Sequence, residues 1–182
     1  MNKIIKTFLA FAVILLVITM YGMFFCSSHI HFERKITINQ KKAIVFNYLN
    51  DYRNYNYWSP WYKMDTAAVY ILEANQPGPG SVIRWKSEKR ELGSGYVKII
   101  STSGDSLIHQ ELNFSNTPST SDFRLTENQG VTTLIWSLES EVGSNPLLRI
   151  MGKFIDSMVK DDFENGLKNI KANSEKIIDV QS

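Results

Sequence analysis

The stretch NPLLRIMGKFIDSMVKDDFENGLKNI, residues 145–170, decides the fold of this chain. Asn145 can cap a helix, and Pro146 suits the first helical position. Apolar side chains then recur at steps of three to five residues: Leu148, Met151, Ile155, Met158, Phe163, Leu167 and Ile170. This spacing predicts one amphipathic helix of roughly 25 residues. Because its apolar side is too broad to face water, the helix must lie across a sheet.

The residues before this helix form short apolar runs separated by turn formers. Turn signals such as Pro77–Gly80 and Gly93–Gly95 return about every ten residues, which is typical of successive antiparallel hairpins. A strand with one wet face is expected at 30–38, and helices at 41–52 and 54–58. Further strands are expected near residues 67–73, 81–88, 94–101, 105–114, 120–127 and 131–140. The predicted fold is α+β, a seven-stranded antiparallel curved sheet around the long C-terminal helix, in the order strand, two helices, six strands, helix.

Parity along these strands separates two faces of the sheet. The apolar parity, which should face the helix, consists of Ile83, Trp85, Val97, Ile99, Ile108, Leu112, Phe114, Phe123, Leu125, Leu134, Trp136 and Leu138. The other parity is mainly charged, with Arg84, Lys86, Lys98, His109, Glu111, Arg124, Glu139 and Glu141. Opposite charges can pair across strands in water, so this second face is expected to be a solvated outer surface.

The inner face and residues 46–62 together hold many aromatic rings, which are hard to pack without gaps. A curved sheet gripping one helix leaves room between them, and ring walls with few polar groups favour a cavity for an apolar ligand. We expect Trp58 and Trp61 near its entrance and Gln110 to orient the polar end of the ligand. The remaining ligand-binding side chains are expected to be Trp85, Phe114, Phe123, Trp136, Phe154 and Met158. The alternative is that the rings simply fill the core.

Short motifs follow one another in a fixed order along residues 30–176. They are Val45-Phe46 with Tyr48 to Asp51, Trp58-Ser59-Pro60-Trp61, Gly80 with Trp85, Gly93 to Gly95, Thr133 with Trp136, and Asp162 to Lys171. In their order and spacing they resemble the START-like, or SRPBCC, superfamily, in particular its polyketide cyclase/dehydrase-type branch. The resemblance implies a helix-grip fold, in which the sheet wraps around the C-terminal helix. It also implies a hydrophobic tunnel, which in relatives holds lipids, sterols, polyketides or other apolar molecules.

Activity transfers from such a family only where matching chemistry is present. A cyclase needs an acid, base or nucleophile aimed into the cavity, but the inward strand positions offer only Ser87 and Gln110 as polar side chains. We therefore expect a non-catalytic domain without cofactor or metal. A cyclase/dehydrase-type enzyme is the alternative if any of four side chains faces inward: Glu73, Asp105, Glu111 or His109. A third alternative is an envelope protein-interaction module with a collapsed pocket.

The N-terminal run FLAFAVILLVITMYGMFF, residues 8–25, contains 18 residues without a charge. With the residues just before it, the apolar segment covers 4–25, enough to cross a hydrocarbon core of about 30 Å as a helix. Because Lys3 and Lys6 lie at its short end, the positive-inside rule predicts a cytoplasmic N-terminus and an extracytoplasmic C-terminal domain. A cleaved signal peptide, or lipidation at Cys26, is the alternative.

The chain is expected to divide into a stub with a transmembrane helix (1–28), one ligand-binding domain (29–176) and a frayed tail (177–182). Residues 27–182 carry 18 Lys and Arg against 18 Asp and Glu. Such a neutral domain has no excess of positive charge with which to neutralise phosphates, which argues against a nucleic-acid-binding protein. The expected partners are a small hydrophobic ligand and the membrane.

Overall fold

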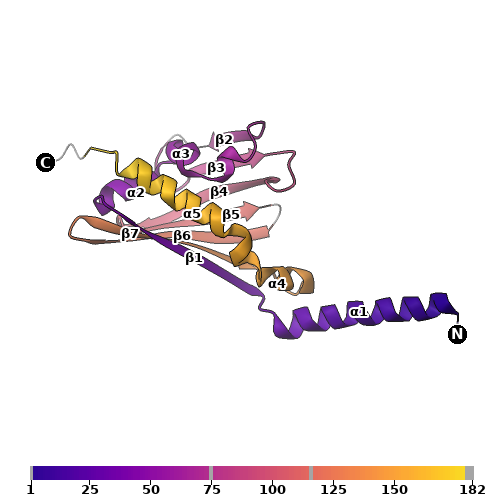
Figure 1. Ribbon diagram of the computed structural model, residues 1–182. Helices are drawn as coiled ribbons and strands as arrows, with labels where there is room; N and C mark the ends of the chain where they lie inside the picture. Colours follow the sequence, from indigo (N-terminus) through magenta and orange to yellow (C-terminus); the bar gives the residue numbers. More distant parts are fainter. Residues whose placement is uncertain (1, 74–75, 115–116, 179–182) are drawn as a thin grey trace.

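The computed structural model describes residues 2–73, 76–114 and 117–178, so residues 179–182 of the predicted tail lie outside it. Within the described residues, seven strands pair into one antiparallel sheet in the order β1-β7-β6-β5-β4-β3-β2 (Figure 1). The strands are β1 (His29–Ile38), β2 (Val69–Glu73), β3 (Val82–Lys86), β4 (Ser94–Ser103), β5 (Leu107–Phe114), β6 (Thr117–Asn128) and β7 (Val131–Glu141). The predicted sheet is confirmed, with strand ends shifted by a few residues.

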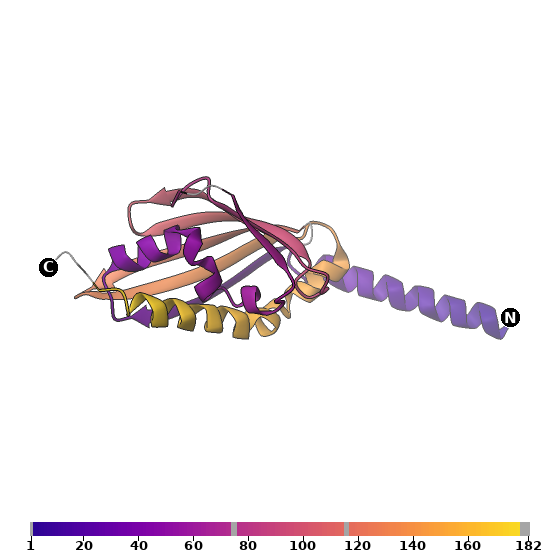
Figure 2. The same cartoon turned by 90° about the horizontal axis from the view of Figure 1, so that it is seen from above.

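Helices of the domain cover one face of this sheet. The sheet curves around α5 (Ile155–Ser174), and α2 (Lys42–Asn50) and α3 (Tyr55–Trp58) lie on the same side (Figure 2). The remaining elements are α1 (Lys3–Phe25), which projects from the domain, the 3-10 turns η1 (Tyr52–Asn54) and η2 (Trp61–Lys63), and α4 (Pro146–Gly152). The predicted helix-grip arrangement is confirmed.

The single helix predicted from residue 145 is wrong in one respect, because it breaks into α4 and α5. Asn145 caps α4 as expected, accepting hydrogen bonds from the backbone N–H groups of Leu147 and Leu148 at 3.0 and 3.2 Å. At the break, the N–H of Lys153 donates to the carbonyl of Ile150, three residues back rather than four, at 3.1 Å. Such bonds tighten the last turn and redirect the chain.

The break divides the predicted apolar face into two parts with different surroundings. In the C-terminal part, Phe163, Leu167 and Ile170 are buried against the sheet, as predicted. In the N-terminal part, Met151 and Met158 are 45% and 59% exposed, so the expectation that they join the core is wrong.

Strand parity correctly assigned the inner face of the sheet. Its apolar side chains are buried or partly buried. A bulge in β4 shifts the register between Ile99 and Ser101, after the two inner positions predicted on this strand, Val97 and Ile99, so it does not affect them. Gly166 allows the close approach expected of a helical glycine, because a Cβ there would lie 2.7 Å from Trp136 Cζ3. The centre of α5 is therefore seated directly on a ring of β7.

Candidate ligand-binding site

Five aromatic side chains from four parts of the chain meet between the sheet and α5. We call this set the inner ring cluster: Trp58, Trp61, Phe123, Trp136 and Phe163. Trp136 is its centre, with ring centroids 4.1 Å from Phe163, 5.1 Å from Phe123, 5.6 Å from Trp58 and 5.7 Å from Trp61. The structure thus brings together four of the predicted site residues and adds Phe163, whose apolar helical spacing was the signal for its burial.

The cluster contains very few polar atoms. Trp136 Nε1 donates to Ser121 Oγ at 2.9 Å. Trp58 is 2% exposed, and its Nε1 has no hydrogen-bond partner among the described residues. A buried N–H without an acceptor costs about 1–3 kcal/mol. The Trp58 indole is therefore a donor available to a polar atom that enters the cluster.

Gln110 is buried on β5, as predicted, but its amide is engaged within the protein. Its Nε2 donates to Tyr52 Oη at 2.8 Å, joining β5 to η1. Burial raises the pKa of the Tyr52 phenol well above its usual value, so this hydroxyl is neutral. Tyr52 was not among the predicted site residues.

Trp85 and Phe114 form a second, smaller ring pair near the ends of β3 and β5. Their ring centroids are 6.1 Å apart, and Trp85 Nε1 donates to the carbonyl of Leu92 at 3.1 Å. The ring of Trp85 covers Gly95, where a Cβ would lie 2.6 Å from Cζ2. Phe114 is only partly buried, so this pair lies at the rim of the sheet–helix interior.

Phe154 and Met158 lie apart from both ring groups. They are 60% and 59% exposed, whereas Ile155 and Val159 are partly buried and Val159 packs against the core, so Phe154 and Met158 lie on the opposite side of the helix. The structure therefore does not place them as walls of the interior.

The rings of the inner cluster occupy the volume in which the sequence predicts a cavity. A hollow with a volume of about 530 Å³ lies elsewhere, between α2, α3 and the end of α5. Its lining residues are Ile44, Asn47, Tyr48, Asn54, Tyr57, Asn173 and Ile177. Burial raises the pKa of Tyr48 in this wall to about 12. Its asparagines follow no periodic pattern that sequence reasoning could have used.

The side chains that an enzyme would need inside are all paired away from the ring cluster. Each has a partner on the outer face or in a turn: Glu73 with Arg84, Asp105 with Lys42, Glu111 with Tyr96, and His109 with Asp122. Tyr96 donates its hydroxyl hydrogen to Glu111, which raises the pKa of that phenol.

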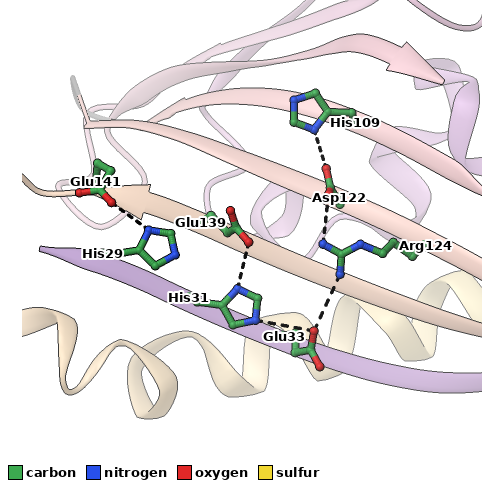
Figure 3. A network of polar contacts seen from close by, with 8 residues as sticks. All are labelled: His29, His31, Glu33, His109, Asp122, Arg124, Glu139 and Glu141. Atoms are coloured by element: carbon green, nitrogen blue, oxygen red, sulfur yellow. Dashed lines mark hydrogen bonds and ion pairs between the residues drawn. The ribbon is translucent and has the colours of Figure 1, made fainter. Parts of the chain in front are cut away.

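The outer face carries a network of histidines and charged side chains (Figure 3). His29 lies 2.9 Å from Glu141, His31 lies 3.3 Å from Glu139, and both pairs stand directly opposite in the β1–β7 register. Arg124 bridges two further acids, Asp122 at 3.2 Å and Glu33 at 3.9 Å. Among the residues that the structure describes, no group of three or more His, Cys, Asp or Glu is arranged to hold a metal ion.

A buried carboxylate that the sequence analysis missed holds the segment around η2 against β3. Asp65 Oδ1 accepts the N–H of Ala67 at 3.0 Å, and Oδ2 accepts the hydroxyl of Ser87 at 2.5 Å. Lys89 Nζ adds a bond to the carbonyl of Met64 at 2.9 Å. The Ser87 hydroxyl, then the Ala67 N–H, hold the pKa of Asp65 below its usual value. Ser87 thus anchors a loop instead of facing a ligand.

The chain was compared with known protein families and with curated proteins. Residues 29–175 match the model of a family described as polyketide cyclase/dehydrase and lipid transport. No curated protein matches the chain.

Solved structures of several relatives share the fold. The solution structure of KanY is 15% identical, with a TM-score of 0.60, covering 81% of this chain and 98% of that chain. The di-domain ARO/CYC StfQ from the steffimycin biosynthetic pathway is 12% identical, with a TM-score of 0.62, covering 81% of this chain and 51% of that chain. Truncated norcoclaurine synthase from Thalictrum flavum is 7% identical, with a TM-score of 0.64, covering 82% and 96%. At such identities these likenesses show the fold alone.

The family match begins at the first residue of β1 and ends one residue beyond α5, so it takes in every element that builds the inner ring cluster. The chain therefore belongs to the polyketide cyclase/dehydrase and lipid transport family, within the START-like, or SRPBCC, superfamily.

Proposed function

We propose that this chain is a membrane-anchored protein whose extracytoplasmic domain binds a small hydrophobic or amphipathic molecule between the sheet and α5, without catalysing a reaction. The observation that carries the proposal is the unpartnered Nε1–H of Trp58 inside a ring cluster whose other described polar atoms, on Trp136 and Ser121, bond to each other. A ligand with an apolar body and a neutral acceptor, such as an ester or ketone carbonyl, would satisfy that donor while contacting the rings.

Binding requires the rings to move apart. The free energy lost with the ring contacts can be offset by burying the apolar body of the ligand. Each aromatic pair contributes about 0.5–1.5 kcal/mol beyond its buried area. Separating Trp136 from its four ring neighbours therefore costs about 2–6 kcal/mol. Burying one methylene group yields about 0.8 kcal/mol, so a chain of eight methylenes offsets even the upper figure.

The anchor in this proposal is α1. With 23 residues, α1 is long and apolar enough to cross a membrane; an N-terminal signal sequence can have the same length and composition. Its large apolar side chains are 38–80% exposed, so the domain does not cover them. Lys3 and Lys6 at its start favour a cytoplasmic N-terminus.

The non-catalytic part of the proposal is supported by the placement of the candidate acids and bases. Glu73, Asp105, Glu111 and His109 each pair with a partner outside the ring cluster. The polar atoms described within the cluster, an indole N–H and a bonded pair of Trp136 and Ser121, supply no base.

A second candidate function is an interaction module with a collapsed interior. The close ring contacts around Trp136 favour it, because they fill the space between sheet and helix. The two functions differ in whether an apolar molecule can reach the rings.

Quenching of tryptophan emission tests this directly. The chain has four tryptophans, all in the domain, so their emission in the full chain reports on its interior. In dodecyl maltoside, we expect the methyl ester of dibrominated stearic acid to quench this emission saturably and several-fold more tightly than dibrominated octadecane, which lacks an acceptor. Trp58→Phe should reduce that preference for the ester, and the unbrominated ester is the control for quenching itself.

Each outcome separates the hypotheses. Absence of quenching by either compound, together with no co-purified molecule in intact mass spectrometry, would refute ligand binding and favour the interaction module. Quenching with an ester preference that Trp58→Phe leaves unchanged would refute the role of the Trp58 donor.

A further inference from the structure

Four apolar side chains on α4 and the start of α5 point into solvent. Leu147, Met151, Phe154 and Met158 are 60%, 45%, 60% and 59% exposed. They are spaced four, three and four residues apart, which is the spacing of one helix face. Lys153 and Phe154, at the junction of the two helices, keep right-handed helical dihedral angles, so the chain changes direction there without unwinding. We call these four side chains the exposed stripe.

The helix α4, which carries Leu147 and Met151 of the stripe, lies beside the C-terminal end of α1. Gly22 of α1 packs on Pro146 so closely that a Cβ at position 22 would lie 2.7 Å from Pro146 Cβ. Arg149 Nη1 donates to the carbonyl of Met23 at 3.0 Å, and Lys153 Nζ donates to Tyr21 Oη at 3.0 Å. Both views show α4 alongside this end of α1 (Figures 1 and 2).

The length of α1 sets the depth of this junction in a bilayer. Its 23 residues extend for about 34 Å at 1.5 Å per residue, slightly more than a hydrocarbon core of about 30 Å. With Lys3 and Lys6 at one boundary, Tyr21 to Phe25 reach the other. Because α4 packs on these residues, it lies at the same level, where a tyrosine and basic side chains meet the headgroups.

We infer that the exposed stripe docks the domain onto the outer surface of the same bilayer that α1 crosses. The stripe enters the boundary between headgroups and acyl chains, while Arg149 and Lys153 stay at the level of the phosphates. This is the arrangement of an interfacial amphipathic helix. The inference rests on the proposed insertion of α1, and it adds a second contact that fixes the orientation of the domain.

A lipid surface suits the stripe better than a protein partner because of its position. The helix that carries Leu147 and Met151 contacts α1 through Arg149 and Lys153, and Asp156, the acid between Phe154 and Met158, is paired with Arg34. A phospholipid headgroup layer offers the matching negative charge.

Site-directed spin labelling of the full chain tests the inference. In a Cys26→Ser background, which removes the single cysteine, labels are placed at Phe154→Cys and Met158→Cys. The matched control is Lys168→Cys, an exposed position further along α5, and Val17→Cys reports on α1. The protein is reconstituted in nanodiscs of phosphatidylcholine and phosphatidylglycerol, and collision rates with oxygen and a water-soluble nickel chelate are compared.

We expect the oxygen-to-nickel collision ratio at positions 154 and 158 to be several-fold higher than at 168 and below that at 17. A stripe as accessible to nickel as position 168, with position 17 in hydrocarbon, would overturn the docking while leaving the anchor intact. Exclusion of both reagents from the stripe would indicate a protein partner or a second copy, and would also overturn it. Nickel access at position 17 would refute the anchor itself and the docking with it.

Discussion

Adding one methyl group at Gly166 tests how closely α5 is seated on the inner ring cluster. A Cβ at this position would lie 2.7 Å from Trp136 Cζ3 and 3.3 Å from Pro60 Cδ. Carbon atoms in ordinary contact are about 3.5–4.0 Å apart, so the helix or the indole must move by about 1 Å.

The surroundings leave little room for that movement. Trp136 is 3% exposed, and its ring is held by Phe163 at 4.1 Å and by Phe123 at 5.1 Å between centroids. Overpacking a filled core costs about 1–3 kcal/mol, and this site belongs at the upper end of that range. Alanine recovers about 1 kcal/mol through its higher helix propensity. The net loss is about 2 kcal/mol, a fall of about 4–8 °C in melting temperature.

Thermal unfolding of the full chain in dodecyl maltoside, followed by tryptophan emission, measures this loss. Asn165→Ala is the matched control, since Asn165 is exposed on the same helix and its replacement should leave the melting temperature equal or slightly higher. Trp136→Phe removes the atom that clashes, so Gly166→Ala should cost less in that background. A Gly166→Ala protein that melts at or above the wild-type temperature would refute the close contact.

Two further predictions concern buried polar groups. Gln110→Leu leaves the Tyr52 hydroxyl without its donor and should cost about 1–3 kcal/mol, part of which Tyr52→Phe restores; additive losses in this double-mutant cycle would contradict the hydrogen bond. The pKa of Asp65 is lowered by Ser87 and Ala67, so its contribution to stability is present above its ordinary pKa of about 3.8 and is lost as the pH falls through the lowered pKa. Asp65→Asn should therefore weaken the loss of melting temperature on acidification below about pH 4, and an unaltered acid profile would contradict this.

The sheet and the seat of α5 were predictable because they follow periodic rules. Alternation of apolar and polar residues predicts a strand with one buried and one solvent-exposed face. The spacing of Phe163, Leu167 and Ile170 predicts a helix face packed against a core. The same rule failed at Met151 and Met158. Periodicity indicates an apolar face but not what covers it. An apolar face turned away from the sheet therefore cannot be distinguished in the sequence from one that packs against the core.

For the candidate site, the sequence indicated which rings face the interior of the sheet but not whether those rings fill it. Strand parity placed Phe123 and Trp136 on the inner face, but Trp58, which we expected near an entrance, is 2% exposed within the cluster. The filling of the space between the rings depends on the exact placement of each ring. The bond between Asp65 and Ser87 joins residues 22 positions apart in the chain, on either side of β2 and β3, and no local sequence pattern indicates such a contact.

Only three residues, Cys26 to Ser28, separate α1 from β1, and they span at most about 10 Å. Together with the contact of Gly22 with Pro146, this short connection restricts the motion of the domain relative to α1, in contrast to a domain on a long flexible linker. With α1 in the bilayer, the domain travels only by lateral diffusion. A ligand bound as proposed would pass to and from the adjacent leaflet, or to a protein that collides with the domain in the same membrane, rather than across an aqueous compartment.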